Sequence, residues 1–231
     1  MITREPSSTP LGLVIFDCDG VLVDSEVVAN RVAAEEVTAL GWPMTTAESV
    51  AWFMGLRLSD MPPIIERRLG RPVPERWVGR LRDRIIAALA ESVEAVPGAA
   101  AALRSVAALG VPYRVASNSS HEEMQVKFER TGLAALVEGR VHSARDVARG
   151  KPAPDLFLAA AAAEGVSPGA CLVIEDSVPG CRAAAAAGMA CLGLAMHGDG
   201  TALAAEGAVP VKSLAEAVAA VKRAVSARAA A

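Results

Sequence analysis

From Pro97 onward, short apolar runs alternate with longer helical stretches, and this alternation is the feature that most limits the possible folds. Helical stretches, each followed by a glycine suited to a helix C-terminus, are expected at residues 99–109, 121–131, 154–164 and 179–187. Strands or strand ends are expected at residues 111–117, 139–144, 170–176, 189–195 and 208–213. Strands that alternate with helices predict a Rossmann-like α/β core, a parallel sheet with helices on both faces.

One more apolar run, Leu13 to Phe16, continues directly into the acidic residues Asp17 and Asp19. The run should belong to the same sheet. A buried strand should not end in unpaired carboxylates, because each charge removed from water costs several kcal/mol. The strand must therefore end at solvent or beside a cationic group.

The pattern changes between Asp24 and Ala95, where the sequence shows helical segments and no convincing strand. The clearest helix spans Pro74 to Ala95, with apolar residues four apart on one face. An insertion after the first strand lies over the edge of the sheet where open α/β folds bind ligands. We therefore predict a core of residues 1–24 and 96–231 and a helical cap of residues 25–95. The aromatic residues expected in the cap core are Trp42, Trp52, Phe53 and Trp77.

The composition narrows the choice of partner. The chain has 231 residues, of which 52% are hydrophobic, and a net charge of −3 without a Lys/Arg block, so a small molecule is a better fit than a nucleic acid. No apolar run reaches the roughly 18 residues of a membrane span, and the polar first ten residues lack a signal-peptide core, which together predict a cytoplasmic protein. The four cysteines fit no metal or disulfide spacing and are expected to be buried thiols. A monomer or small homo-oligomer is expected.

Four segments place polar residues where apolar strands stop, and the ends of parallel strands share one edge of a sheet. Gathered carboxylates need a counter-charge, because two unit charges about 4 Å apart interact by roughly 4 kcal/mol even at an effective dielectric constant of 20. Hard oxygen ligands with few other protein donors favour Mg²⁺, which usually shares a substrate phosphate. The converging residues are Asp17, Asp19, Ser117, Asn118, Lys151, Glu175 and Asp176.

This set of groups suits phosphoryl chemistry. A magnesium ion, a lysine and a Ser/Asn pair can all bind a phosphoryl group. A carboxylate is already ionised at neutral pH and can attack phosphorus without a general base. One of Asp17 and Asp19 would then attack, while the other handles a proton.

The motifs DCDGVLVDSE, a strand ending in Ser117, GKPAPD and IEDSVPG resemble those of the haloacid dehalogenase-like hydrolase superfamily. More narrowly, they are similar to the subgroup with a helical cap after the first strand, which holds sugar-phosphate phosphatases, phosphoglycolate phosphatases and β-phosphoglucomutase. The resemblance implies that Asp17 forms an aspartyl phosphate, and that Asp19 protonates the leaving group and then activates water.

The resemblance also implies the binding roles. Ser117 and Asn118 would hold phosphoryl oxygens, and Lys151, through a cis bond to Pro152, would neutralise charge and orient Asp17. Mg²⁺ would be bound by Asp17, the backbone carbonyl of Asp19 and Asp176, with Glu175 as a further ligand or a neighbour of the ligands.

Several reactions occur in this superfamily, and the sequence discriminates among them. The full acidic set argues against a dehalogenase, and the absence of lysine from residues 24–95 argues against a Schiff-base phosphonate hydrolase. A mutase is disfavoured because Ala29 and Leu58 stand where its cap histidine and arginine would align. A catalytically silent homologue is also disfavoured, because such a protein would usually lack one of the acids and this chain has all of them.

The segment Gly55 to Met61 resembles the cap loop of hexose- and hexitol-phosphate phosphatases. There a glycine makes a turn, and the basic residue after it faces the site. We therefore predict that Gly55, Arg57 and, beside the phosphate site, His121 contact the substrate. The sequence predicts a magnesium-dependent phosphatase acting on a small phosphomonoester, a sugar or sugar-acid phosphate.

Overall fold

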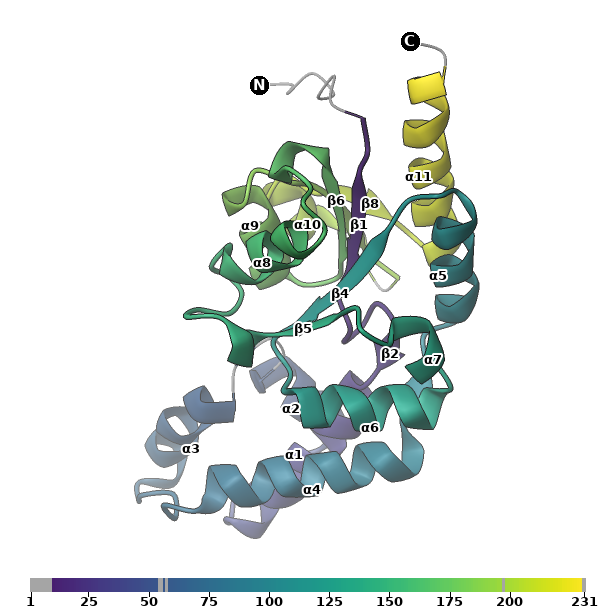
Figure 1. Ribbon diagram of the computed structural model, residues 1–231. Helices are drawn as coiled ribbons and strands as arrows, with labels where there is room; N and C mark the ends of the chain where they lie inside the picture. Colours follow the sequence, from purple (N-terminus) through teal and green to yellow (C-terminus); the bar gives the residue numbers. More distant parts are fainter. Residues whose placement is uncertain (1–9, 54–55, 57, 197, 230–231) are drawn as a thin grey trace.

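The computed structural model describes residues 10–53, 56, 58–196 and 198–229. Its centre is a parallel sheet in the order β5-β4-β1-β6-β7-β8 (Figure 1). Strand β1 lies in the middle and pairs in parallel with β4 and β6. The predicted parallel sheet is therefore confirmed. Its strands are β1 Leu13–Phe16, β4 Tyr113–Ser117, β5 Val141–Ser143, β6 Cys171–Glu175, β7 Ala190–Leu194 and β8 Val209–Val211.

Helices cover both faces of this sheet, and the side chains of β1 divide between the two cores by the two-residue period of a strand. Val14 and Phe16 belong to the cluster that includes α5 (Ala99–Ala108) and α11 (Leu214–Ala229). Leu13 and Ile15 belong to the opposite cluster, with α8 (Asp155–Ala163) and α9 (Val178–Ala186). Both faces of β1 are thus buried, which explains its uninterrupted apolar sequence.

The remaining elements of this part of the molecule connect or flank the sheet. Helix α6 follows β4, and the short helix α7 follows α6. Their bounds are α6 His121–Thr131, α7 Ala134–Val137 and α10 Thr201–Ala205, with 3₁₀ turns at Ala144–Asp146 and Pro168–Ala170.

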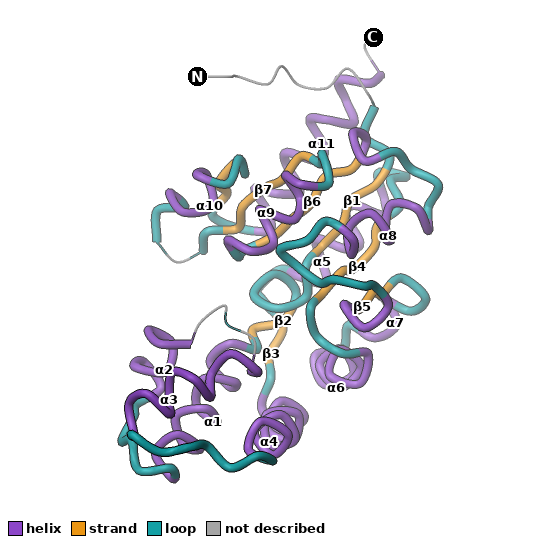
Figure 2. Tube along the Cα trace, turned by 90° about the vertical axis from the view of Figure 1, so that its left-hand side faces the viewer, coloured by secondary structure: helices purple, strands orange, loops and turns teal. Residues whose placement is uncertain are grey.

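Four helices form a separate group beyond the carboxyl ends of the sheet strands (Figures 1 and 2). They are α1 Glu26–Ala39, α2 Thr46–Phe53, α3 Met61–Leu69 and α4 Trp77–Ser92, with a 3₁₀ turn at Leu58–Asp60. An antiparallel pair, β2 (Val23–Asp24) and β3 (Glu94–Ala95), lies where the chain enters and leaves this group. The division at residues 24/25 and 95/96 stays a prediction, and both of its borders fall at this pair.

The strand pair corrects the prediction of an all-helical segment between Asp24 and Ala95. The helix expected to reach Ala95 ends at Ser92, because Val93 adopts an extended conformation, with ψ of 141°. Glu94 and Ala95 then pair with Asp24 and Val23. Two residues per strand carry almost no periodic signal, so the sequence pattern did not reveal them.

The aromatic core of the helical group is as predicted except at one residue. Trp77 is fully buried, and Trp42 and Phe53 are nearly so, whereas Trp52 is 52% exposed. Trp52 and Phe53 are adjacent on α2, and consecutive helical side chains point about 100° apart, so both cannot face the core. Trp52 instead packs edge-on against Trp42, with ring centroids 5.3 Å apart.

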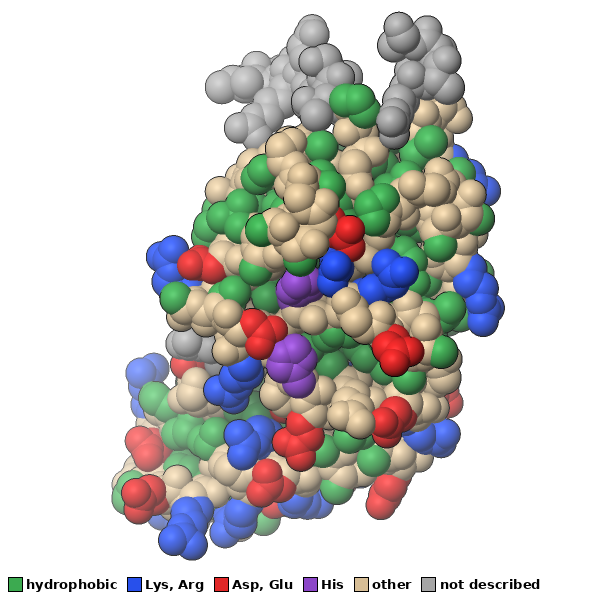
Figure 3. Space-filling model, in the orientation of Figure 1, with side chains coloured by type: hydrophobic (Ala, Val, Ile, Leu, Met, Phe, Trp, Pro, Cys, Tyr) green, Lys and Arg blue, Asp and Glu red, His purple; other side chains and the backbone are tan. Residues whose placement is uncertain are grey.

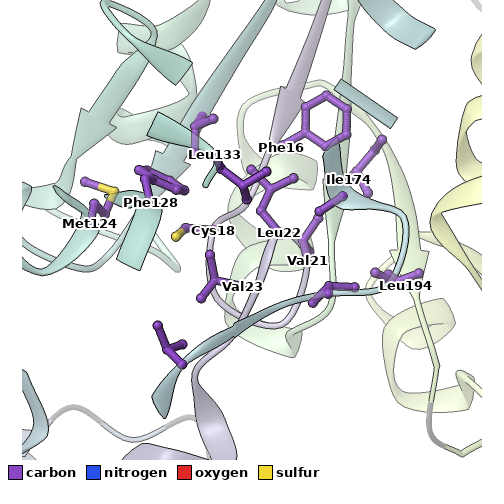
Figure 4. Close-up of a cluster of buried hydrophobic side chains, with 14 of the residues drawn as sticks. Phe16, Cys18, Val21, Leu22, Val23, Met124, Phe128, Leu133, Ile174 and Leu194 are labelled. Atoms are coloured by element: carbon purple, nitrogen blue, oxygen red, sulfur yellow. The ribbon is translucent and has the colours of Figure 1, made fainter. Parts of the chain in front are cut away.

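The turn after β1 is anchored by apolar side chains. Val21, Leu22 and Val23 have no exposed surface, and Figure 4 shows Val21 and Leu22 lying toward Phe16 and Ile174 and Val23 beside Cys18. This packing holds the backbone between Asp17 and Asp19 at the edge of the sheet.

Two further expectations can be compared with the fold. All four cysteines are buried free thiols, as predicted. None of the helices in the described part of the chain combines the length and the apolar character that a membrane span requires.

Candidate active site

The carboxyl ends of β1, β4 and β6 open into a cleft of about 1110 Å³ that faces the helical group. The polar residues predicted to converge do so here, because parallel strands deliver their ends to one edge. Residues of α4 and of the turn before α3 form the opposite wall. The predicted residues that line the cleft are Asp17, Asp19, Ser117, Asn118, Lys151, Glu175 and Asp176.

Asp17 and Lys151 form the buried centre of this cleft. The Lys151 Nζ atom lies 2.5 Å from Asp17 Oδ1 and 2.7 Å from Glu175 Oε2. Burial and the neighbouring Glu175 carboxylate raise the pKa of Asp17 to about 7, although the Lys151 ammonium opposes them. Lys151 therefore orients Asp17 without neutralising the whole acidic group.

A third carboxylate completes a possible metal site. Oxygen atoms of Asp17, Glu175 and Asp176 lie within 4.8 Å of one another. These three carboxylates face the single ammonium of Lys151, so the cluster holds an excess of two negative charges when all are ionised. Burial, followed by the charges of Glu175 and Asp17, raises the pKa of Asp176, and the Lys151 ammonium opposes them only in part.

The local backbone is shaped around these carboxylates. Gly20 has a positive φ of 75°, and a Cβ atom on it would lie 1.8 Å from Asp176 Oδ2. A Cβ atom on Gly180 would lie 2.0 Å from the Glu175 carboxyl. An oxygen donor set with two excess negative charges fits Mg²⁺, which prefers carboxylate ligands and dehydrates only in part.

Glu175 differs from Asp176 in how it is held. Its Oε1 atom accepts hydrogen bonds from the Ser177 hydroxyl at 2.7 Å and from the Ser177 and Asp176 backbone N–H groups. Its Oε2 atom accepts from Lys151. Both oxygens of Glu175 thus already have protein donors, which suits a residue that holds the ligands in place better than one that binds the ion directly.

Asp19 lies in a different environment from Asp17, although only Cys18 separates them. Its Oδ1 atom accepts from Ser25 and, at 2.5 Å, from Lys127 Nζ. Its Oδ2 atom accepts from the Ser119 and Ser117 hydroxyls at 2.9 and 3.1 Å. Burial raises the pKa of Asp19, but the charge and hydrogen bond of Lys127, together with the hydrogen bonds of Ser25 and Ser119, lower it to about 2.

Lys127 is a charged residue of the site that the sequence analysis missed, as it missed the hydroxyls of Ser25, Ser119 and Ser177. It lies on α6, its side chain is 5% exposed, and its ammonium also donates to Ser119 at 2.8 Å. A sequence signal exists in retrospect. Lys127 occupies the buried stripe of α6 between Met124 and Phe128, at the spacing where an apolar residue is expected.

Asn118 holds the loop that carries Lys151. Its side-chain Oδ1 accepts from the Lys151 backbone N–H at 2.9 Å, and its Nδ2 donates to the Lys151 carbonyl at 3.1 Å. Both polar atoms of the side-chain amide thus bond to the Lys151 loop, and the contact of Asn118 with phosphoryl oxygens stays a prediction. The expected cis bond between Lys151 and Pro152 is present.

The remaining predicted contacts are placed as follows. The side chain of His121 is 55% exposed and turns to Asp146, with Nε2 2.8 Å from Oδ1. Its neighbours Ser119, Ser120 and Glu123 are the residues of this segment that line the cleft. Gly55 and Arg57 lie outside the described residues, so their contact with a substrate stays a prediction.

The fold and the acidic edge of the sheet define a hydrolase-type α/β protein with a substrate cleft under a helical cover. A sequence profile of the haloacid dehalogenase-like hydrolases matches residues 11–188, and the chain belongs to this family.

Among its relatives, the 6-phosphogluconate phosphatase of Escherichia coli (strain K12) is 31% identical over 177 residues, which cover 76% of this chain and 79% of that protein. A hydrolase of the same family from Deinococcus radiodurans R1, solved with bound phosphate and sodium, is 35% identical with a TM-score of 0.80, covering 94% of this chain and 97% of that one. A protein from Thermotoga maritima, provisionally assigned as a β-phosphoglucomutase, is 27% identical with a TM-score of 0.76, covering 92% and 99% of the two chains.

Proposed function

We propose that this protein is a magnesium-dependent phosphatase that hydrolyses a sugar or sugar-acid phosphate through an aspartyl phosphate on Asp17. The observation that carries the proposal is the buried contact between Asp17 and Lys151 beside the carboxylates of Glu175 and Asp176. A carboxylate that is fixed by an ammonium at the floor of a cleft is positioned to attack an electrophilic phosphorus atom.

In the first step, an oxygen of Asp17 forms a bond to phosphorus while the bond from phosphorus to the ester oxygen breaks. Lys151, 2.5 Å from Asp17, offers positive charge to the phosphoryl oxygens as negative charge accumulates on them. The hydroxyl of Ser117, which is buried at the end of β4, is a further donor beside the cleft. The leaving alkoxide requires a proton, so Asp19 must carry one on Oδ2 when the substrate is bound, and it donates that proton as the ester bond breaks.

In the second step, water attacks the phosphorus of the aspartyl phosphate and regenerates the Asp17 carboxylate. Asp19 takes the proton from that water. This role needs a carboxylate that faces the cleft, and the Asp19 side chain is 29% exposed there.

Asp17, Asp176 and the backbone carbonyl of Asp19 would hold Mg²⁺, with Glu175 fixing the arrangement beside them. The bound ion would supply positive charge to the phosphoryl oxygens and balance the two excess negative charges of the cluster. A cap of residues 25–95 would cover the cleft during turnover and keep bulk water from the aspartyl phosphate.

Three observations support a polar sugar-type leaving group. The outer cleft is lined by charged and hydroxyl side chains from both walls, among them Glu26, Ser59, Arg82 and Arg145. Figure 3 shows acidic and basic side chains interspersed on the visible face of the molecule, without a continuous basic field. The similarity to a 6-phosphogluconate phosphatase points in the same direction.

The test is a screen of sugar phosphates, sugar-acid phosphates and 4-nitrophenyl phosphate, with and without Mg²⁺, scored by phosphate release and kcat/KM. We expect Mg²⁺-dependent release with at least one sugar or sugar-acid phosphate, and no turnover by a folded Asp17→Asn variant. Isomerisation of a sugar phosphate without net phosphate release would instead identify a mutase. Absence of turnover for every substrate, the aryl phosphate included, would identify a silent homologue.

A further inference from the structure

Two lysines of the described chain have buried side chains, and each is paired with one of the two aspartates that follow β1. The sequence contains four lysines, of which Lys212 and Lys222 are exposed. Lys151 is paired with Asp17, and Lys127 is paired with Asp19. The proposed mechanism uses Lys151 but gives no role to Lys127.

A buried ammonium requires a reason. Removing a charge from water costs several kcal/mol, and a buried ion pair often contributes less stability than apolar residues of the same volume. Lys127 sits in the apolar stripe of α6, where Leu or Met would pack without that cost. Its ammonium bonds to Asp19 and Ser119, both of which line the cleft. The location of these partners favours a role in the site over a role in the core.

The two oxygens of Asp19 are held by different kinds of donor. Oδ1 is bound by the charged ammonium of Lys127 together with the hydroxyl of Ser25. Among the residues that the structure describes, Oδ2 is bound only by the neutral hydroxyls of Ser117 and Ser119. A hydroxyl hydrogen can rotate away and the oxygen can accept in turn, whereas an ammonium can only donate. Oδ2 is therefore the oxygen that can exchange its partner for a proton or a water.

We propose that Lys127 is a positioning residue that fixes Oδ1 of Asp19 and so leaves Oδ2 facing the reacting ester oxygen. The inference rests on the proposed phosphatase function. It goes further by assigning distinct tasks to the two oxygens and by naming the group that keeps them apart. Lys127 acts through Asp19 and does not touch the substrate. Without it, the carboxylate is held by hydroxyls alone and can rotate away from the position that proton transfer requires.

The test compares two leaving groups in the Lys127→Met variant of the full chain. An alkoxide needs a proton to leave, whereas 4-nitrophenolate is a stable anion that leaves without one. The parameter is kcat/KM, which includes formation of the aspartyl phosphate and excludes its later hydrolysis. We expect kcat/KM for 6-phosphogluconate, or for a better alkyl phosphate from the screen, to fall at least about tenfold, because small misplacement of a catalytic group is costly. For 4-nitrophenyl phosphate the fall should be less than about threefold.

Two comparisons complete the design. The variant Asp19→Asn should show the same preference for the aryl phosphate, and adding Lys127→Met to it should leave the aryl kcat/KM unchanged. Lys212→Met removes an exposed ammonium and should leave kcat/KM unchanged for both substrates. If Lys127→Met proves too unstable to fold, Lys127→Arg keeps the charge, moves the donor atoms and should show the same selective loss.

The outcomes are distinct. An equal fall in kcat/KM for both substrates would show that Lys127 has only a structural role. A further fall in kcat/KM for 4-nitrophenyl phosphate, when Lys127→Met is added to Asp19→Asn, would show the same. An unchanged or increased kcat/KM for the alkyl phosphate in Lys127→Met would overturn the positioning role. Failure of the wild-type protein to hydrolyse any phosphate would instead refute the proposed function itself.

Discussion

Replacing Gly20 by alanine should disturb the proposed metal site and leave the rest of the fold intact. Gly20 has a φ of 75°, and an added Cβ would lie 1.8 Å from Asp176 Oδ2. Real Cβ contacts are essentially never this short, so the Asp176 carboxylate must leave its position. Gly110 is a matched control, because its φ is 72° and a Cβ atom there would meet nothing within 4 Å.

The size of the effect follows from two contributions. The left-handed backbone costs a non-glycine residue about 1–2 kcal/mol, and both variants share this cost. The second contribution, the displacement of the Asp176 carboxylate, arises only in Gly20→Ala. A ligand that binds the folded state at a concentration of about 100 Kd stabilises it by about 2.7 kcal/mol, so the wild-type protein and Gly110→Ala should gain about this much from Mg²⁺. Gly20→Ala should gain less than about 1 kcal/mol, because one ligand has been displaced.

The assay is urea-induced unfolding of the three proteins, with Mg²⁺ and with a chelator. The comparison needs no substrate, so it tests the metal site independently of activity. An undiminished Mg²⁺-dependent gain in Gly20→Ala would show that Asp176 is not a ligand. A loss of the gain in Gly110→Ala as well would show that backbone strain, and not the displaced carboxylate, is responsible.

Three more changes test other parts of the molecule. Lys151→Ala should lower kcat by about 10²–10³, as the loss of a preorganised electrostatic partner does, and a loss below tenfold would place Lys151 outside the reaction. Leu81→Ala, on the fully buried face of α4, should destabilise the protein by about 2–5 kcal/mol in urea unfolding, and a change below 1 kcal/mol would contradict its core position. Hydrogen bonds from Ser143 and His121 lower the pKa of Asp146, so its stabilisation is present above its ordinary pKa near 4 and is lost as the pH falls below that value. Asp146→Asn should therefore cost at most about 1 kcal/mol at pH 7, and a difference from wild type that persists at about pH 2 would refute the linkage.

Local signals explain why some elements could be predicted from the sequence and others could not. Helix α6 was expected at residues 121–131 and spans His121–Thr131. Both of its ends are encoded locally, by the capping box of Ser120 and Glu123 and by Gly132 in the left-handed conformation. The end of α4 depends instead on Glu94 pairing with Asp24, a contact that no local signal encodes.

The same distinction applies to the site. The carboxylates at the ends of β1 and β6 could be predicted to meet, because the rule that parallel strands share an edge needs only the order of elements. The hydrogen bonds between the Asn118 side chain and the Lys151 backbone could not, because they depend on how two loops pack. As a result, the sequence placed Asn118 in the site but did not reveal that its side-chain amide holds the Lys151 loop.

Lys127 shows how a sequence analysis could recover such a residue. The ion pair with Asp19 joins residues 108 positions apart, so spacing alone cannot reveal it. Two local anomalies point to it all the same, namely a lysine inside the apolar stripe of α6 and a second carboxylate beside a strand end. A buried cation and a buried anion are each too costly to remain unpaired. When a chain contains one of each without a local partner, pairing them is the simplest hypothesis, and here it would have brought Lys127 to the carboxylates that follow β1.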